Sequence, residues 1–271
     1  MKYCRILIGS LLLFQAVSFR AGARAFAATF FGEVPKGLVE LKDYNNPVYV
    51  FIPPGQDKSL LNSMILIVPD PKEAPDDLVN EWLSIAKKKN LIVAVPVMQM
   101  ERDSVPFRTD EWLLKVKKDL TDRYHVGKAY LIGKGEGAQY AAYLAVQYPE
   151  QFSGAGLLDG SWVGPFEKVM RLSSRPARQV PFFISLFGPD AELMKQTEDR
   201  AYRYTARGYL VYLEKFEKNE KVDSLDLKAR MIDWLQKKAE SWEQVMAQSG
   251  KTKKEKISKW LGEFISSPVH S

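Results

Sequence analysis

Short apolar segments alternate with longer amphipathic segments through most of the chain. Most of the apolar segments have proline, glycine or aspartate at or near their end, as strands buried on both faces do. We expect these strands at 46–54, 63–71, 91–97, 128–133, 154–160, 180–188 and 208–216. Helical spacing of apolar residues indicates helices at 74–90, 109–126, 136–147, 190–206 and 223–248. This alternation predicts a single α/β domain with a mostly parallel central sheet and helices on both faces.

The segment 1–27 has the pattern of a secretory signal peptide. Two basic residues precede an apolar run over 6–19, and small residues that suit a cleavage site follow at 21–27. The run is shorter than the roughly 20 apolar residues that span a bilayer, so it favours cleavage over a retained anchor, which is the alternative. We therefore expect an exported protein, periplasmic or extracellular, with its folded domain over 28–248.

Positive charge is concentrated at the two ends of the chain. The sequence has 39 basic and 33 acidic residues, and four of the basic residues but no acid lie in 1–27, so the mature chain would carry +2. The segment 251–271 holds five lysines and two glutamates, which leaves the folded body near −1. A body without excess positive charge gives no indication of nucleic-acid binding.

Cysteine and histidine are too scarce to build the usual metal and redox sites. The only cysteine, Cys4, would leave with the signal peptide, so the mature protein has no thiol for a disulfide, a nucleophile or a metal. The two histidines, His125 and His270, do not form a set with the spacing of metal ligands. We expect no metal site and no cofactor.

A run of spaced glycines marks one strand-to-helix corner. Gly133, Gly135 and Gly137 follow an apolar strand in the pattern Gly-Lys-Gly-Glu-Gly and open an alanine-rich helix. The pattern resembles the nucleophile elbow, Gly-x-Ser-x-Gly, whose outer glycines keep the tight corner free of side chains. Gly135 takes the place of the serine, in a backbone conformation that costs glycine little. A phosphate cradle is the alternative use of these glycines, because a helix N-terminus attracts anions.

The chain from 60 to 238 resembles the α/β-hydrolase fold, most of all the secreted polyhydroxybutyrate depolymerases and feruloyl esterases. The resemblance rests on the elbow, on the phrase YPEQFSGAGLLDG at 148–160, and on the order of the elements before them. It implies an esterase fold with a Ser-His-acid triad and an oxyanion loop after the first central strand. Asp190 in LFGPDAEL matches the acid of the triad, and the histidine is expected near Asn219.

This sequence departs from the hydrolase pattern at the residues that carry the chemistry. Gly135 replaces the nucleophile, and the segment around Asn219 offers no imidazole. Where the family has the His-Gly of the oxyanion loop, this chain has Pro69, which has no N–H to donate, and Asp70, which adds a negative charge. His125 precedes a strand, at the end away from the elbow. These departures predict a degenerate site, that is, a pseudoenzyme that binds rather than cleaves.

Residues that follow the strands are expected to line a ligand crevice, because open α/β sheets bind ligands at the carboxyl ends of their strands. In this chain they are Pro69, Asp70, Glu136 and Trp162. The expected partner is a small ester-like or saccharide ligand, or another envelope protein. The alternative is a hydrolase with displaced chemistry that uses Glu136, Asp190 or Asp70 as catalytic carboxylates. Glu136 also fits the acid favoured in the first turn of a helix, and Lys134 is expected to face solvent.

The end of the chain, 249–271, is expected to form a basic amphipathic helical tail. Lysines come first, and apolar residues then recur at helical spacing: Ile257, Trp260, Leu261, Phe264 and Ile265. Residues 251–265 are suited to contact an anionic membrane surface or a partner protein. The alternative is a terminal helix packed on its own domain with its lysines in water.

Overall fold

A computed structural model describes residues 37–44, 46–54, 61–70, 73–97, 107–175, 179–218 and 220–241. The predicted signal peptide (1–27), the predicted tail (249–271) and Asn219 lie outside the described residues, so these predictions stay predictions. In the described ranges, no helix combines the length and the apolar composition that a membrane span requires.

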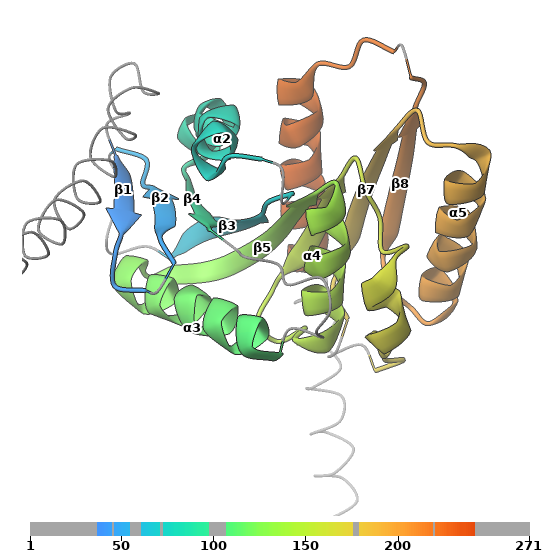
Figure 1. Cartoon of the computed structure of the whole chain (residues 1–271), viewed down its shortest axis with the longest axis horizontal. Coiled ribbons are helices and arrows are strands. Elements are labelled where there is room, and N and C mark those ends of the chain that lie inside the picture. Colours follow the sequence, from blue (N-terminus) through green and yellow to red (C-terminus); the bar gives the residue numbers. More distant parts are fainter. Residues whose placement is uncertain are drawn as a thin grey trace, which may run out of the picture. The chain divides into compact units, whose positions relative to one another are not determined.

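Eight strands form one sheet, and helices cover it (Figure 1). The strands are β1 (Leu38–Leu41), β2 (Val48–Phe51), β3 (Asn62–Val68), β4 (Leu91–Pro96), β5 (Val126–Lys134), β6 (Gly154–Leu158), β7 (Phe182–Phe187) and β8 (Val211–Phe216). The α-helices are α2 (Pro75–Lys89), α3 (Phe107–Tyr124), α4 (Glu136–Gln147) and α5 (Ala191–Ala206), with a 3₁₀ helix η1 (Pro165–Val169). A further helix covers residues 224–241.

The order of the strands in the sheet is β1-β2-β4-β3-β5-β6-β7-β8. The pairs from β4 through β8 are parallel, while β2 runs antiparallel to β4, with Val48 opposite Pro96. The prediction of a mostly parallel sheet is therefore confirmed. The predicted strands at 46–54 and 63–71 follow each other in sequence, but they do not pair, because β4 lies between β2 and β3.

The chain reverses its direction across the sheet at β3. It passes from β3 through α2 to β4 on one side, and then through α3 to β5 on the other side of β3. Because parallel crossovers are right-handed, two crossovers in opposite directions place their helices on opposite faces. Figure 1 shows α2 and the helix of residues 224–241 on one face, and α3, α4 and α5 on the other. The ends of β3 and β5 thus meet at a topological switch point, where such sheets bind ligands.

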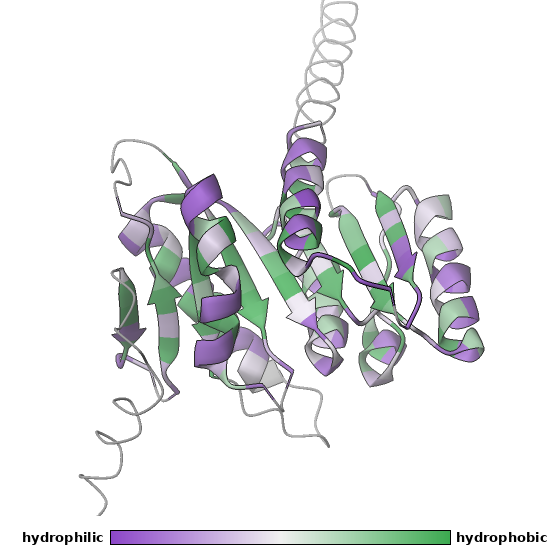
Figure 2. Ribbon diagram, turned by 90° about the horizontal axis from the view of Figure 1, so that it is seen from above, coloured by the Kyte–Doolittle hydropathy of each residue, from purple (hydrophilic) through white to green (hydrophobic). Residues whose placement is uncertain are grey.

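Strand residues are buried on both faces of the sheet. In β3, Met64, Leu66 and Val68 belong to the core beneath α3 and α4, while the alternating residues Ile65 and Ile67 are buried on the opposite face. Figure 2 shows the consequence, since the strands are predominantly hydrophobic and the helices carry hydrophilic residues as well. The near-continuous apolar runs of the sequence are explained by this burial.

A buried carboxylate joins α3 to α4. Asp110 is fully buried, and its oxygens accept hydrogen bonds from the hydroxyls of Tyr140 (2.6 Å), Tyr143 (2.7 Å) and Tyr148 (3.1 Å). Burial raises the pKa of all three tyrosines, and the neighbouring Asp110 raises it further, to about 12 for Tyr148. The tyrosines are therefore neutral donors at ordinary pH, and the cluster anchors the helix that follows the glycine corner.

Two described elements lack a sequence signal that could predict them. Strand β1 buries only Leu41, and η1 has no buried residue, so neither shows the apolar periodicity of a core element. The helix predicted over 109–126 begins at Phe107 and ends at Tyr124. His125 adopts a positive φ of 51° in the turn that leads into β5.

Candidate functional site

The glycine corner lies at the carboxyl end of β5, where the chain enters α4. Gly135 has φ 52° and ψ −123°, a conformation that residues with a β-carbon rarely adopt. Its N–H donates to the carbonyl of Leu158 at 3.0 Å, so the corner is tied to the end of β6. The backbone of this corner therefore has the sharp turn expected of an elbow.

The outer glycines are required by close backbone packing. A β-carbon at Gly133 would lie 2.6 Å from the carbonyl oxygen of Gly137 and 2.7 Å from the nitrogen of Ala138. A β-carbon at Gly137 would lie 2.6 Å from the carbonyl oxygen of Pro69. Real β-carbons do not come this close to backbone atoms. The spacing of these two glycines thus reflects the contact of α4 with β5 and with the loop after β3.

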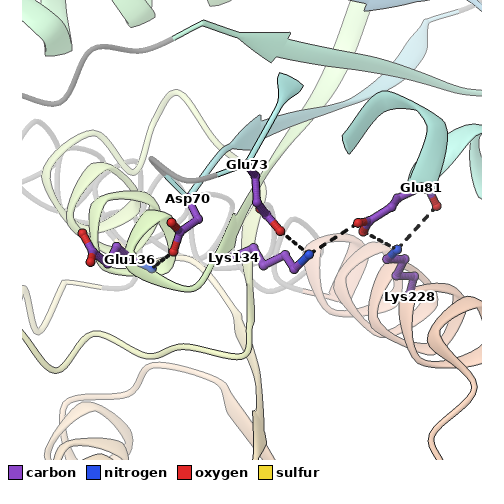
Figure 3. A network of polar contacts seen from close by, with 6 residues as sticks. All are labelled: Asp70, Glu73, Glu81, Lys134, Glu136 and Lys228. Atoms are coloured by element: carbon purple, nitrogen blue, oxygen red, sulfur yellow. Dashed lines mark hydrogen bonds and ion pairs between the residues drawn. The ribbon is translucent and has the colours of Figure 1, made fainter. Parts of the chain in front are cut away.

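Asp70 occupies the space in front of Gly135. Its Oδ2 accepts a hydrogen bond from the backbone N–H of Glu136 at 3.1 Å (Figure 3), and a β-carbon at Gly135 would overlap the same oxygen. The parallel pairing of β3 with β5, with Val68 opposite Gly133, brings the two segments together. A negative charge is favoured at this place because it is the N-terminus of α4. A carboxylate oxygen thus lies where an elbow would hold its nucleophile.

The N–H that Asp70 engages is the one that follows the nucleophile position. In hydrolases with this elbow, that N–H helps to bind the oxyanion of the tetrahedral intermediate. Here it donates to the Asp70 carboxylate. The predicted crevice residues Pro69, Asp70 and Glu136 are therefore brought together by the fold, with Asp70 in contact with the backbone of Glu136.

Glu136, Asp190 and Asp70, the carboxylates that the alternative hydrolase would use, do not form one cluster in the structure. The Glu136 side chain points away from Asp70 (Figure 3). Asp190 is the N-cap of α5, and its Oδ1 accepts a hydrogen bond from the N–H of Leu193 at 2.7 Å. It follows β7, which lies two strands from β5, about 10 Å at the usual spacing of strands. Among the described residues, no hydrogen bond joins Asp190 to a serine or a histidine, and no group of three or more His, Cys, Asp or Glu side chains is placed to hold a metal ion.

The expectation that Trp162 faces a ligand is wrong. Trp162 is fully buried, its ring stacks on Tyr204 with centroids 4.2 Å apart, and its edge meets Phe182 at 5.4 Å. The chain after β6 turns inward beneath α5, so this tryptophan becomes part of the core. His125, as expected, lies at the opposite end of β5, roughly 30 Å from Gly135 at the rise of an extended strand.

Sequence reasoning missed a network of charged residues beside the corner (Figure 3). Lys134, which was expected to face solvent, forms ion pairs with Glu73 and with Glu81, the latter at 3.4 Å. Lys228 is buried, pairs with the other carboxylate oxygen of Glu81 at 3.0 Å, and lies 5.3 Å from the centre of the Trp82 ring. The network fastens the end of β5 to α2 and to the helix of residues 224–241. No local pattern could have predicted it, because its members are far apart in sequence.

The ion pair of Glu81 with Lys134 is charged at neutral pH. Burial by itself raises the pKa of Glu81, but Lys228 and Lys134 outweigh it and hold that pKa below its ordinary value of 4.5. Burial lowers the pKa of Lys134, and the carboxylates of Glu73 and Glu81 outweigh it, so that pKa is raised. Glu81 therefore stabilises the fold above its ordinary pKa, and this contribution is lost as the pH falls through the lowered value.

Several solved structures share this architecture at low sequence identity. A thermostable esterase is 16% identical with a TM-score of 0.54, and the match covers 74% of this chain and 62% of the esterase, less than two thirds of its length. A hormone-sensitive lipase from a metagenome library is 12% identical with a TM-score of 0.53, over 83% of this chain and 96% of the lipase. An esterase from the bacterial hormone-sensitive lipase family is 14% identical with a TM-score of 0.55, over 76% and 87%.

No protein-family model and no curated protein sequence matches the chain. The finer resemblance to polyhydroxybutyrate depolymerases and feruloyl esterases stays a prediction. The likeness to the solved esterases and lipases agrees with the strand order, with the reversal at β3 and with the sharp turn at Gly135. The chain has the α/β-hydrolase fold.

Proposed function

We propose that this protein is a non-catalytic relative of the esterases, exported from the cell, whose former active-site crevice binds a ligand without cleaving it. The single observation that carries the proposal is the position of Asp70. Its Oδ2 takes the N–H of Glu136 and fills the space in front of Gly135. The same oxygen therefore blocks both the place of a nucleophile and a donor that an oxyanion would need.

The energies involved favour loss of acyl-transfer chemistry. Loss of one oxyanion-hole donor costs about 3 kcal/mol of transition-state stabilisation. A carboxylate beside the developing oxyanion adds a repulsion of about 4 kcal/mol for charges about 4 Å apart at an effective dielectric constant of about 20. Together these terms amount to roughly five orders of magnitude in rate, before the missing hydroxyl at Gly135 is considered.

The chemistry of the crevice suggests which ligand it would hold. Asp70 and Glu136 present carboxylate oxygens, which accept hydrogen bonds and disfavour anions. A ligand with several hydroxyl donors, such as a saccharide, suits these acceptors better than an ester, whose oxygens only accept. We therefore place a saccharide before a small ester or an envelope protein as the expected partner.

Activity measurements on the intact protein test the proposal. We expect no labelling by a fluorophosphonate probe and no turnover of aryl esters, either by the wild-type protein or by the Asp70→Asn variant. Asp70→Asn keeps the size of the side chain and removes its charge, so it is a matched control for a catalytic carboxylate. Turnover by the wild-type protein that disappears in Asp70→Asn would instead establish the carboxylate-based hydrolase.

Introducing the missing hydroxyl is expected to damage the corner without restoring activity. Gly135→Ser should lower the free energy of unfolding by about 2 kcal/mol, because a side chain at φ 52° is strained and its β-carbon displaces Asp70 from the Glu136 N–H. Urea denaturation measures the stability, and aryl-ester hydrolysis measures the activity. Esterase activity in Gly135→Ser would show that a base is present near the corner.

A double-mutant cycle separates the overlap with Asp70 from the backbone strain. Asp70→Gly removes the oxygen that the new β-carbon would meet, so Gly135→Ser should cost about 1 kcal/mol less in that background. Asp70→Gly alone serves as the reference for the lost hydrogen bond. Strictly additive effects of the two substitutions would mean that Asp70 does not fill the space in front of Gly135.

A further inference from the structure

A second candidate site lies between η1 and α5, away from the elbow. A cavity of about 170 Å³ is lined there by Arg200, Arg203, Tyr204 and Arg207 from α5 and its C-terminal end, and by Glu167, Met170 and Leu172 from η1 and the segment after it. Helix α5 leads from the carboxyl end of β7 to the amino end of β8. The last turns of α5 therefore lie near the amino-terminal ends of the parallel strands, whereas the elbow lies at their carboxyl ends. We call this feature the arginine cavity.

Arg200 and Arg203 lie one turn apart in α5, and Arg207 is the C-cap residue that follows the helix. All three side chains line the same cavity, which brings their guanidinium groups together. Arg200 is paired with Glu167, with 2.6 Å between Nε and Oε1. Arg203 and Arg207 are exposed, and within the described part of the chain they form no ion pair. Glu167, the carboxylate that lines the cavity, is paired with Arg200, so the lining carries more positive than negative charge.

Stabilisation of the helix end explains only part of this arrangement. Basic residues in a last turn interact favourably with the helix macrodipole, and α2 has Lys87, Lys88 and Lys89 in the same position. The lysines of α2 show that ammonium groups are sufficient to stabilise a helix end, so this role does not require arginine. At the end of α5, Arg203 in the last turn and Arg207 at the C-cap line a cavity together with buried Tyr204, whose ring is held against Trp162. Cations one turn apart also repel each other, which an anionic ligand would relieve.

We propose that the arginine cavity binds a phosphate monoester that carries a small apolar group. The planar fork of a guanidinium matches two phosphate oxygens, and a phosphate dianion compensates the two charges of Arg203 and Arg207. The apolar wall of Met170 and Leu172 suits the organic group. The arginine cavity shares no residue with the elbow crevice, so a test of phosphate binding there does not depend on the proposed function.

Isothermal titration of the full chain with phenyl phosphate tests the site. We expect binding by the wild-type protein, at least tenfold weaker binding of benzoate, which carries the same ring and a single charge, and weaker binding at higher ionic strength. Arg203→Gln/Arg207→Gln should weaken phenyl phosphate binding roughly 100-fold, because each arginine provides charged hydrogen bonds. The Lys87→Gln/Lys88→Gln variant removes the same charge from the end of α2 and should bind like the wild-type protein.

Vesicles that contain phosphatidic acid form a second arm of the experiment, because a lipid headgroup also presents a phosphate monoester. Arginine-dependent binding to vesicles but not to phenyl phosphate would assign the phosphate to a lipid. The single variants Arg203→Gln and Arg207→Gln keep the test valid if the double variant does not fold. The proposal is overturned if the wild-type protein binds neither probe, or if binding is the same in the arginine variants.

Discussion

Replacing Asp110 by alanine is expected to lower the free energy of unfolding by about 4 kcal/mol. The substitution removes the common acceptor of three hydroxyls, and those of Tyr140 and Tyr143 belong to buried residues. A buried donor left without a partner costs about 1–3 kcal/mol, and the lost volume adds a cavity at the joint between α3 and α4. Urea denaturation followed by circular dichroism measures the effect. The backbone at Gly135 should also become more mobile, because Gly135 is the N-cap of α4.

Two variants serve as controls for the loss of Asp110. Asp122→Ala removes an exposed carboxylate from the same helix, where it pairs with Lys118, and should change the stability by less than about 0.5 kcal/mol. Asp110→Asn keeps the shape and one acceptor, so it should cost about half as much as alanine. If Asp110→Ala is as mild as Asp122→Ala, the tyrosines find other partners and the cluster is not an anchor.

The pH dependence gives a second measure of the same cluster. The pKa of Tyr148 is raised from 10.0 to about 12, so the unfolded chain releases its phenol proton at a lower pH than the folded chain. The stability that this tyrosine contributes is therefore present below pH 10 and is lost as the pH rises from 10 to about 12. Without Asp110, which helps to raise this pKa, the alkaline loss should be smaller. Phenolate absorbance in the folded protein follows the titration.

Replacing Glu81 by alanine is expected to lower the free energy of unfolding by about 3 kcal/mol. The reason is that Lys228 is buried and would lose its carboxylate partner. Its remaining contacts would be the backbone carbonyl oxygen of residue 81, which is 3.4 Å from Nζ in the wild-type structure, and the face of the Trp82 ring. Leaving one member of a buried ion pair without its partner costs about 3–5 kcal/mol, and we expect the lower end of this range because Lys228 is buried while the Glu81 side chain is 39% exposed. Lys134 suffers less, because it retains its ion pair with Glu73. Chemical denaturation at neutral pH measures the difference.

The opposite substitution in this pair should be much milder. Lys228→Met fills nearly the same volume with an apolar side chain against Trp82, and Glu81 keeps Lys134 as its partner, so we expect a loss of about 1 kcal/mol or less. Glu217→Ala, which removes an exposed carboxylate near Lys215, should be nearly neutral. Equal effects of Glu81→Ala and Lys228→Met would show that packing, and not the buried charge, is what the network provides. The difference between wild type and Glu81→Ala should also shrink as the pH falls below 4.5.

Local patterns were sufficient for strands β2 to β8 of the sheet, but not for β1, which buries only Leu41. Helix α4 has the bounds that were predicted, 136–147, because glycines precede it and a tyrosine-proline pair follows it. The steric role of Gly133 and Gly137 also followed from their spacing alone. The burial of Asp110 did not, because an acid in the first turn of a helix ordinarily faces water and stabilises the macrodipole. The surroundings of Lys134 and Trp162 were not predicted either, because a side chain at or just past the end of a strand can face solvent, a charged partner or the core.

The sequence by itself determined the α/β alternation, the tight glycine corner and the absence of a hydroxyl at residue 135, because these depend on the type and spacing of neighbouring residues. The sequence predicted that Asp70 lies near that corner, but only the tertiary structure decided that its carboxylate accepts the N–H of Glu136 and fills the space in front of Gly135. The two positions are separated along the chain by α2, β4, α3 and β5, and they meet because right-handed crossovers in opposite directions leave β3 and β5 side by side. Periodicity records which side chains are buried, but pairing across the sheet decides which side chains meet.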